Sequence, residues 1–250
     1  MKKFHYLYTG KEHSWGVIAK DPERQNHLID TNEYVLSNHS ELLICDPGGI
    51  EIYPSVFSSL STEFDPQKIS YIFSSHQDPD VISSLSLWLD LNPNLRCITS
   101  KVWSSFIPHF GGTKETFISI EDKGEIFNFG EIELQLVPAH YLHSSGNFNL
   151  YDPIAGIFYS GDIGASLLPE SELGESLFVE NFDNHIRFAK AFHERWMTSN
   201  EAKIKWCERV SKLKIDLLCP QHGLIYSGQD VERFINWFAE LRVGIAVDSI

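Results

Sequence analysis

One stretch decides the fold: Ile69-Ser70-Tyr71-Ile72-Phe73-Ser74-Ser75-His76-Gln77-Asp78-Pro79-Asp80. An apolar run typical of a strand ends in two small residues, and His76, Asp78 and Asp80 follow at alternate positions. Loops at the carboxyl ends of strands are where open α/β sheets place their sites. An imidazole and two carboxylates at this spacing can bind one metal ion or divide between two adjacent ions. A second interpretation stays open, because Asp78-Pro79 is also a good helix N-cap followed by proline at the first helical position.

Three further segments place a histidine or an aspartate after a strand-like run. His140 and His143 follow the run 131–137, whose strict alternation indicates a half-buried strand. Asp162 follows the second run, and His222 follows the third. Four strand ends that each bring one of these residue types to a loop predict a shared metal site at a sheet edge.

Short apolar runs are numerous, and no Ser/Gly or Pro linker divides the chain, so we expect a single domain over residues 1–250. The predicted strands cover 33–36, 42–45, 69–73, 131–137, 148–151, 156–159 and 215–219. Helical spacing of apolar residues appears at 80–91, 204–213 and 231–241, and Thr198-Ser199-Asn200-Glu201 has the pattern of a capping box. Strands and helices interleave twice, which predicts an α/β sandwich with helices outside packed sheets.

The composition excludes several classes of protein. The chain has 20 Lys and Arg against 34 Asp and Glu, a formal net charge of −14, which disfavours a nucleic-acid-binding face. No apolar run reaches the roughly 20 residues of a membrane span, and no apolar segment of a signal peptide follows Lys2-Lys3. We therefore expect a cytoplasmic protein with no nucleic-acid and no membrane partner. The widely spaced cysteines are expected to be buried reduced thiols: Cys45, Cys97, Cys207 and Cys219.

Most of the eleven histidines are not candidates for metal binding. Seven have no neighbouring carboxylate or histidine at chelating spacing and are interpreted as surface or core residues: His5, His13, His27, His39, His109, His185 and His193. The last two lie eight residues apart in a predicted helix, which is too distant for one metal ion.

The ordered series of candidate ligands resembles the metal-ligand series of the metallo-β-lactamase superfamily: His76, Asp78, Asp80, His143, Asp162 and His222. Cys45-Asp46-Pro47-Gly48-Gly49 also matches an early Asp-x-Gly at a strand end in that superfamily. The resemblance runs from about Leu28 to Ile225. It implies a metallo-β-lactamase-like four-layer αββα sandwich with a binuclear site at one sheet edge.

Asp78 bears on which metal is bound. Zinc hydrolases of the superfamily usually have histidine at this position, whereas the flavodiiron proteins carry a carboxylate, and mixed carboxylate and imidazole ligation suits iron. Four segments also resemble the stand-alone oxygen-binding diiron proteins linked to bacterial oxygen sensing: 28–34, 76–80, 192–197 and 220–223. The resemblance implies a non-haem diiron protein that binds or reduces O2 or NO. It would act as an oxygen sensor or as the catalytic half of a split flavodiiron reductase, an oxidoreductase.

The resemblance also assigns the ligands. Iron 1 would take His76, Asp78 and His143, with Asp162 bridging, and iron 2 would take Asp80, Asp162 and His222.

His143 is preferred to His140 as a ligand because its Leu-His aligns with the ligand of the family; His140 would lie beside the site or replace that ligand. Tyr141 and Trp196 would either shape the pocket or be ordinary core residues.

The sequence departs from the family in two respects. Val81 stands where most members have a further histidine, so iron 2 would lack one imidazole and be more open. The flavodoxin-like domain of the flavodiiron proteins is not expected, so this chain would bind no FMN. A reductase would then need a partner flavoprotein or rubredoxin, and a sensor would need a signalling partner. The head-to-tail dimers of the family imply a homodimer.

A binuclear zinc hydrolase of the same fold is the alternative, with a phosphodiester, thioester or lactone as its substrate. In that case a metal-bound hydroxide would be the nucleophile, and Asp80 would be the catalytic residue that orients it. Val81 counts against this function because it removes a ligand of the second metal. A metal-poor binding module is a third hypothesis.

Overall fold

The chain is described by a computed structural model that covers residues 2–19, 28–172 and 174–250. The chain clusters into two compact units, one up to Glu133 and one from Leu134 onward. The single domain expected from the sequence stays a prediction. His27, interpreted above as a surface or core residue, lies outside the described residues.

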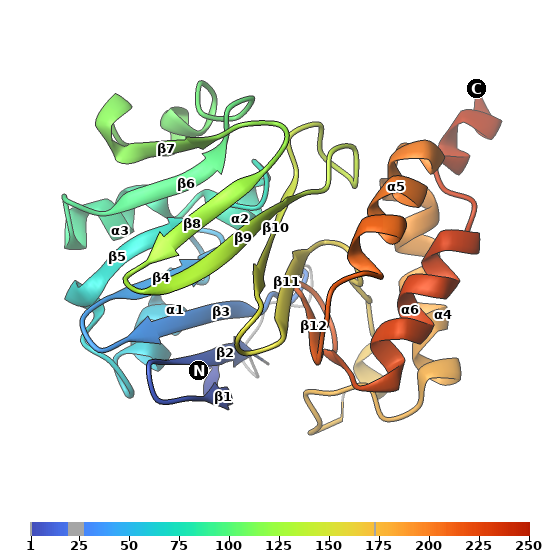
Figure 1. Cartoon of the computed structure of the whole chain (residues 1–250), viewed down its shortest axis with the longest axis horizontal. Coiled ribbons are helices and arrows are strands. Elements are labelled where there is room, and N and C mark those ends of the chain that lie inside the picture. Colours follow the sequence, from blue (N-terminus) through green and yellow to red (C-terminus); the bar gives the residue numbers. More distant parts are fainter. Residues whose placement is uncertain (1, 20–27, 173) are drawn as a thin grey trace. The chain divides into compact units, whose positions relative to one another are not determined.

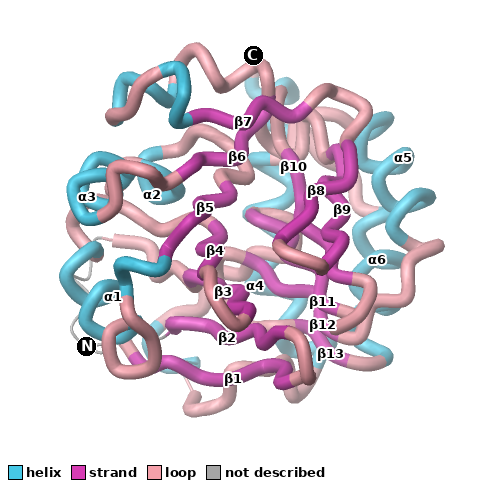
Figure 2. The backbone as a smooth tube through the Cα atoms, turned by 60° about the vertical axis from the view of Figure 1, so that its left-hand side comes forward, coloured by secondary structure: helices cyan, strands magenta, loops and turns pink. Residues whose placement is uncertain are grey.

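The first unit is built on a seven-stranded sheet in which the strand order follows the chain, β1-β2-β3-β4-β5-β6-β7 (Figure 2). Neighbouring strands are antiparallel from β1 to β4 and parallel from β4 to β7. Cys45 of β4 pairs with Phe73 of β5, so the segments after these two parallel strands leave the sheet at the same edge. The elements are β1 (Lys3–Thr9), β2 (His13–Ala19), β3 (Glu33–Asn38), β4 (Leu42–Cys45), α1 (Tyr53–Leu60), β5 (Ile69–Phe73), α2 (Pro79–Ile82), α3 (Leu85–Leu91), β6 (Arg96–Ser100), β7 (Phe117–Ile120) and β8 (Glu125–Phe129).

Helices α1, α2 and α3 cover one face of this sheet (Figure 2). Their apolar residues, such as Val81 and Trp88, form one core with strand residues such as Ile72. The helical run predicted over 80–91 is confirmed, although it is divided into two short helices. Ser84 interrupts the helix: its hydroxyl donates to the Gly48 carbonyl at 2.7 Å and accepts from the Trp88 indole at 3.1 Å.

In the second unit the strand order is β13-β12-β11-β10-β9. β11 and β12 are parallel, and the other neighbours are antiparallel. Helices α4, α5 and α6 lie together on one face of these strands (Figure 1). The elements are β9 (Ile132–Pro138), β10 (Phe148–Asp152), β11 (Ile157–Gly161), α4 (Phe182–Trp196), α5 (Asn200–Val210), β12 (Leu217–Pro220), β13 (Tyr226–Ser227) and α6 (Gln229–Glu240).

The predicted strands and the last two predicted helices are confirmed, although their bounds shift by a few residues. The capping box is not formed from Thr198. The N-cap of α5 is Ser199, whose hydroxyl accepts from the Ala202 amide at 3.1 Å, while the Thr198 hydroxyl donates to the Tyr141 carbonyl. All four cysteines are buried, as predicted.

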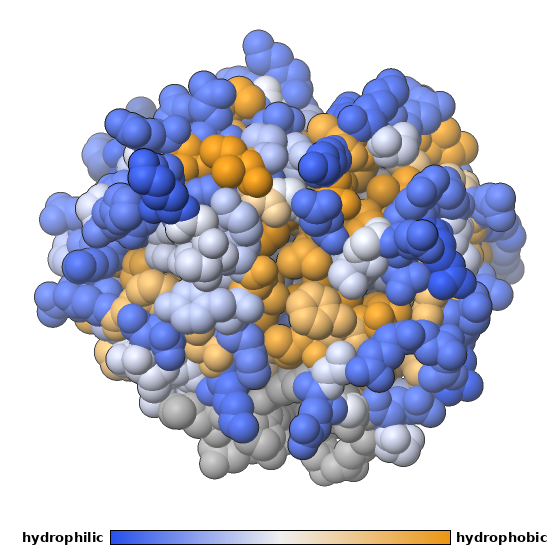
Figure 3. All heavy atoms as spheres, turned by 60° about the horizontal axis from the view of Figure 1, so that its bottom comes forward, coloured by the Kyte–Doolittle hydropathy of each residue, from blue (hydrophilic) through white to orange (hydrophobic). Residues whose placement is uncertain are grey.

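The surface is charged, as the composition predicts, but hydrophobic side chains also gather on the face drawn in Figure 3. Large apolar side chains that are exposed include Ile50 in the first unit and Leu167 in the second. No helix in the described part of the chain has the length and apolar character that a membrane span requires.

The core of the second unit provides a test of the fold. Phe234 of α6 is fully buried, and its ring stacks on that of Phe238 with 5.7 Å between ring centroids. We expect Phe234→Ala to lower the free energy of unfolding by about 3–5 kcal/mol, because it removes buried apolar surface and leaves a cavity. Phe106→Ala is the matched control, since that ring is 59% exposed, and it should cost less than about 1 kcal/mol. Urea unfolding followed by circular dichroism measures both, and equal losses would contradict this core.

Candidate metal centre

Asp162 and His222 are brought together by two parallel strands. Asp162 follows β11 and His222 lies two residues beyond β12, and the ends of these strands pair at Gly161 and Pro220. The Gln221 amide donates to the Gly161 carbonyl at 2.8 Å and continues the pairing past the last residue of β12. Parallel strands end at one edge of a sheet, so the two side chains meet there.

The Asp162 carboxylate lies against two imidazole rings. The His143 Nε2 atom is 2.7 Å from one carboxylate oxygen, and the His222 Nε2 atom is 3.3 Å from the other. All three side chains are buried or nearly so, with exposed fractions of 11% for His143, 6% for Asp162 and 4% for His222. One carboxylate thus has an imidazole nitrogen at each of its oxygens.

The loop after β9 carries His143 and is closed by its own main chain. The Ala139 amide donates to the Asn147 carbonyl at 2.9 Å, and the Tyr141 amide donates to the Ser144 carbonyl at 2.7 Å. The Asn147 side-chain amide also donates to the Leu142 carbonyl. These bonds position the His143 side chain at a fixed point of the loop.

His193 of α4 supports the loop that carries Asp162. Its Nε2 atom accepts from the Gly164 amide at 2.9 Å, and its Nδ1 atom lies 2.7 Å from the Ala189 carbonyl, so the neutral ring uses both nitrogens. The Tyr226 hydroxyl donates to the Gly164 carbonyl at 3.2 Å. The main chain two residues after Asp162 is therefore held from both sides.

Gly223 allows the turn after His222 to pack closely. Its φ is +84°, and a Cβ atom there would lie 2.6 Å from the Ser166 carbonyl oxygen. A larger residue would be strained in its backbone and would collide with the Asp162 loop. The Ser166 amide meanwhile donates to the His222 carbonyl at 3.2 Å.

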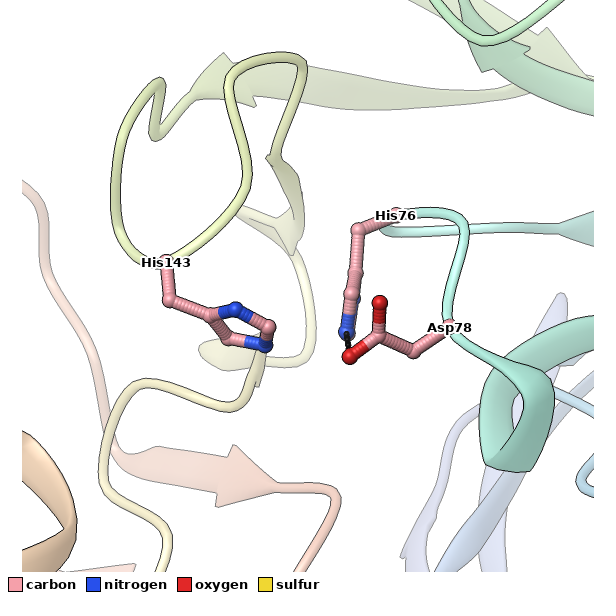
Figure 4. Close-up of side chains that lie close together, drawn as sticks. All are labelled: His76, Asp78 and His143. Atoms are coloured by element: carbon pink, nitrogen blue, oxygen red, sulfur yellow. Dashed lines mark ion pairs between the residues drawn. The ribbon is translucent and has the colours of Figure 1, made fainter. Parts of the chain in front are cut away.

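In the first unit, His76 and Asp78 form a second pair of donors in the loop after β5. His76 is buried, and its Nε2 atom is 3.6 Å from an Asp78 carboxylate oxygen, the contact dashed in Figure 4. Asp78 stands at the N-cap position of α2, but its side chain makes no capping hydrogen bond. The carboxylate instead faces His76 and accepts from the side-chain NH2 group of Gln77 at 2.8 Å. The side chain of Asp78 therefore does not cap α2, and its role as a metal ligand stays a prediction.

The other expected residues of the first unit are placed as follows. Asp80 lies half-buried in the first turn of α2. Val81 is fully buried in the apolar core, and its carbonyl accepts from the Gly48 amide at 3.2 Å. The position at which the sequence resemblance implies a histidine therefore belongs to the apolar core.

Aromatic rings line the histidines of the second unit. Trp196 meets the His143 ring edge-on, with 5.7 Å between ring centroids, and it stacks on Phe192 at a centroid distance of 5.9 Å. The ring centroids of Phe192 and His222 are 6.5 Å apart. Trp196 is 50% exposed and Tyr141 is 54% exposed, so the core interpretation of these two residues is wrong. The His140 ring packs edge-on against Phe148 at 5.1 Å, whereas His143 faces the Asp162 carboxylate.

These donor sets fit iron. The three residues of the second unit offer two imidazole nitrogens and a carboxylate with both oxygens engaged, and the loop after β5 offers an imidazole and a carboxylate. Iron sites in proteins commonly combine these two ligand types. The support from His193 could not be predicted from the sequence, because its partner is the main-chain amide of Gly164, which has no side-chain signature.

An α/β fold with histidines and aspartates at strand ends is typical of the metallo-β-lactamase-like proteins. This chain belongs to the family described as ODP family beta lactamase, whose model matches residues 29–223.

Solved structures agree with this assignment. The apo state of the chemotaxis sensor ODP from T. denticola is 32% identical, with a TM-score of 0.87 over 99% of this chain and 98% of that one. The peroxy diiron species of chemotaxis sensor ODP gives 31% identity and the same TM-score. A mutant flavo di-iron protein from Thermotoga maritima, at 23% identity and a TM-score of 0.80, covers 96% of this chain and 61% of that one and shows the fold alone. The predicted α/β fold of metallo-β-lactamase type is confirmed by these likenesses.

Among curated relatives, an uncharacterized protein of Methanocaldococcus jannaschii is 25% identical over 214 residues, 82% of this chain and 52% of the relative. A diflavin flavoprotein of Synechocystis sp. is 32% identical over 101 residues, 40% of this chain and 17% of the relative. The chain thus spans about half or less of the length of these curated relatives.

The two buried histidines of α4 make the stability of the protein depend on pH. Burial lowers the pKa of both His185 and His193 to about 4, although Asp230 favours the charged form of His185 and the Ala189 carbonyl and Asp162 favour that of His193. In the unfolded chain an imidazole has a pKa of about 6.5. Between these values the unfolded chain binds protons that the folded chain does not, so the free energy of unfolding falls as the pH is lowered from about 6.5 to about 4.

His185 allows a direct test, because its Nε2 atom is buried and has no hydrogen-bond partner among the residues that the structure describes. We expect His185→Phe to reduce the loss of unfolding free energy between pH 6.5 and pH 4.5 by about 2 kcal/mol. Urea unfolding of both proteins in the presence of a chelator measures this difference. Parallel pH profiles for variant and wild type would contradict the prediction.

Proposed function

We propose that this chain is a non-haem diiron protein that binds O2 or NO, as an oxygen sensor or as the catalytic half of a split reductase. One observation carries the proposal: the buried Asp162 carboxylate has the Nε2 atom of His143 at one oxygen and that of His222 at the other. A carboxylate held in this way can bridge two metal ions, with one oxygen toward each. Family membership and the likeness to the chemotaxis sensor ODP, one of whose structures is a peroxy diiron species, support iron as the metal.

The proposed ligands are those implied by the sequence. Iron 1 would be held by His76, Asp78 and His143, iron 2 would be held by Asp80 and His222, and Asp162 would be shared between them. The contact of His76 with Asp78 in one unit and the contacts of Asp162 in the other support this assignment.

Two ferrous ions at this site would supply the electrons for binding a diatomic gas. The residues of the chain supply the arrangement. Asp162 keeps the two imidazoles of its unit on opposite oxygens of one carboxylate, and Phe192 and Trp196 limit the movement of those rings. The Gly164 main chain, bonded to His193 and Tyr226, prevents the Asp162 loop from shifting.

A zinc hydrolase is not favoured. Val81 is buried in the apolar core, so the second metal gains no imidazole from the position that provides one in most of the superfamily. Family membership and the 31% identity to a peroxy diiron species of chemotaxis sensor ODP support iron instead.

The biological setting is also a proposal. We place the protein in the cytoplasm, which its four buried thiols support, because reduced cysteines are typical of that compartment. As an oxidoreductase it would receive electrons from a separate flavoprotein or rubredoxin, and as a sensor it would act on a signalling partner. A homodimer is the proposed assembly. Turnover of O2 with an added reductase separates the two roles.

The first experiment measures the metal. Protein purified anaerobically from iron-replete cells should contain close to two irons per chain by mass spectrometry, and a new visible absorption band should appear on exposure to air. Zinc in place of iron, with no spectral response to air, would refute the proposed function.

Two variants of one loop test the ligand assignment. We expect His143→Ala to lose iron and the air-dependent band, because it removes the imidazole at the Asp162 carboxylate. His140→Ala is the matched control and should retain both, because that ring packs on Phe148 instead. The reverse pattern in metal content would assign the ligand to His140.

A further inference from the structure

A chain of hydrogen bonds connects the segment after β4 to the ring of His76. Asp46 accepts twice from Ser75: one carboxylate oxygen accepts from its amide at 2.7 Å and the other from its hydroxyl. The same hydroxyl oxygen lies 2.8 Å from the His76 Nδ1 atom. All three residues are buried, with exposed fractions of 0% for Asp46 and Ser75 and 1% for His76.

The proton positions in this chain follow from the chemistry of its members. An ionised carboxylate can only accept hydrogen bonds, so the single proton of the Ser75 hydroxyl is donated to Asp46. The hydroxyl oxygen can then only accept from His76, which requires a proton on Nδ1. In a neutral imidazole with Nδ1–H, the other nitrogen carries the lone pair. That nitrogen is Nε2, the atom that faces Asp78.

We propose that Asp46, acting through the Ser75 hydroxyl, positions His76 for metal binding by holding its ring in the Nδ1–H tautomer and in one orientation. Asp46 and Ser75 are positioning residues in this scheme and do not touch the metal. The inference rests on the proposed function in one respect, namely that His76 is a ligand.

The backbone of Asp46 shows how tightly this arrangement is specified. Its φ is +44°, in the left-handed region that residues with a side chain rarely adopt. Its amide also donates to the Phe73 carbonyl at 2.8 Å, which links the ends of β4 and β5. Backbone conformations of this kind persist where the surrounding structure enforces them, and they cluster at functional sites. Here the conformation points both carboxylate oxygens at Ser75.

Ser74 provides a matched control one residue away. It is as buried as Ser75, but its hydroxyl donates to the main-chain carbonyl of His76 at 2.6 Å and not to the ring. Ser74→Ala and Ser75→Ala therefore make the same chemical change at adjacent buried positions. Only the second removes the partner of Nδ1.

Nitrogen-15 NMR of the full-length, metal-free chain with labelled histidine identifies the tautomer of His76. In wild type and Ser74→Ala, His76 should be the Nδ1–H tautomer. In Ser75→Ala it should become a mixture, and the affinity for ferrous iron, measured anaerobically by chelator competition, should fall about 10- to 100-fold. Ser75→Thr should restore both properties because it keeps the hydroxyl.

Asp46→Asn gives a sharper result, because asparagine tolerates the left-handed backbone. Its amide oxygen can still accept from the Ser75 amide, but its NH2 group would donate to the Ser75 hydroxyl. The Ser75 hydroxyl would then donate its proton to the His76 Nδ1 atom, which must carry a lone pair to accept it, so the ring should change to the Nε2–H tautomer. We expect this inversion together with a loss of iron affinity.

The two proposals can fail separately. The positioning role is overturned if Ser75→Ala and Asp46→Asn both leave His76 as Nδ1–H with an iron affinity within about twofold of Ser74→Ala. A wild-type chain that shows the expected tautomers but takes up no ferrous iron refutes the proposed iron function and supports the tautomer control.

Discussion

A buried carboxylate that faces two imidazoles must be held in one orientation, and the second unit is arranged around that requirement. Asp162 is almost inaccessible to water, where a charge is costly unless polar partners surround it. The parallel pair of β11 and β12 provides the common edge, and Gly223 lets the His222 turn pack on the Asp162 loop. His193 and Tyr226 then hold the main chain at Gly164. The packing of α4 against the strands thus serves the site as well as the core.

The first unit orients its histidine in a different way. There the carboxylate of Asp46 reaches the ring through a serine hydroxyl, so the carboxylate stays behind the histidine and leaves its outer nitrogen to Asp78. In the second unit the carboxylate contacts the imidazoles directly. The direct arrangement suits a bridging ligand, whereas the indirect one suits a terminal ligand whose ring must not rotate.

Sequence reasoning predicted the strands that lead into the site, because buried strands with apolar runs have a clear period. It did not predict β1, where polar and aromatic residues of intermediate exposure hide the alternation. The break at Ser84 also escaped it, since the cause is a bond to Gly48, 36 residues earlier. The sequence alone left two interpretations of Asp78 open, a helix N-cap and a metal ligand, because a helix starts at Pro79 under either one. The direction of the carboxylate, toward His76, is visible only in the structure. The bond between Asp46 and Ser75 spans 29 residues and leaves no local pattern.

The support that His193 gives to Gly164 has a consequence for the response of the protein to acid. Its Nε2 atom accepts a main-chain hydrogen bond only while the ring is neutral, and burial lowers the pKa of His193 to about 4. At pH values well above 4 this anchor of the Asp162 loop therefore stays in place. Proton uptake by His193 would release the loop only under the acid conditions that also lower the stability of the fold.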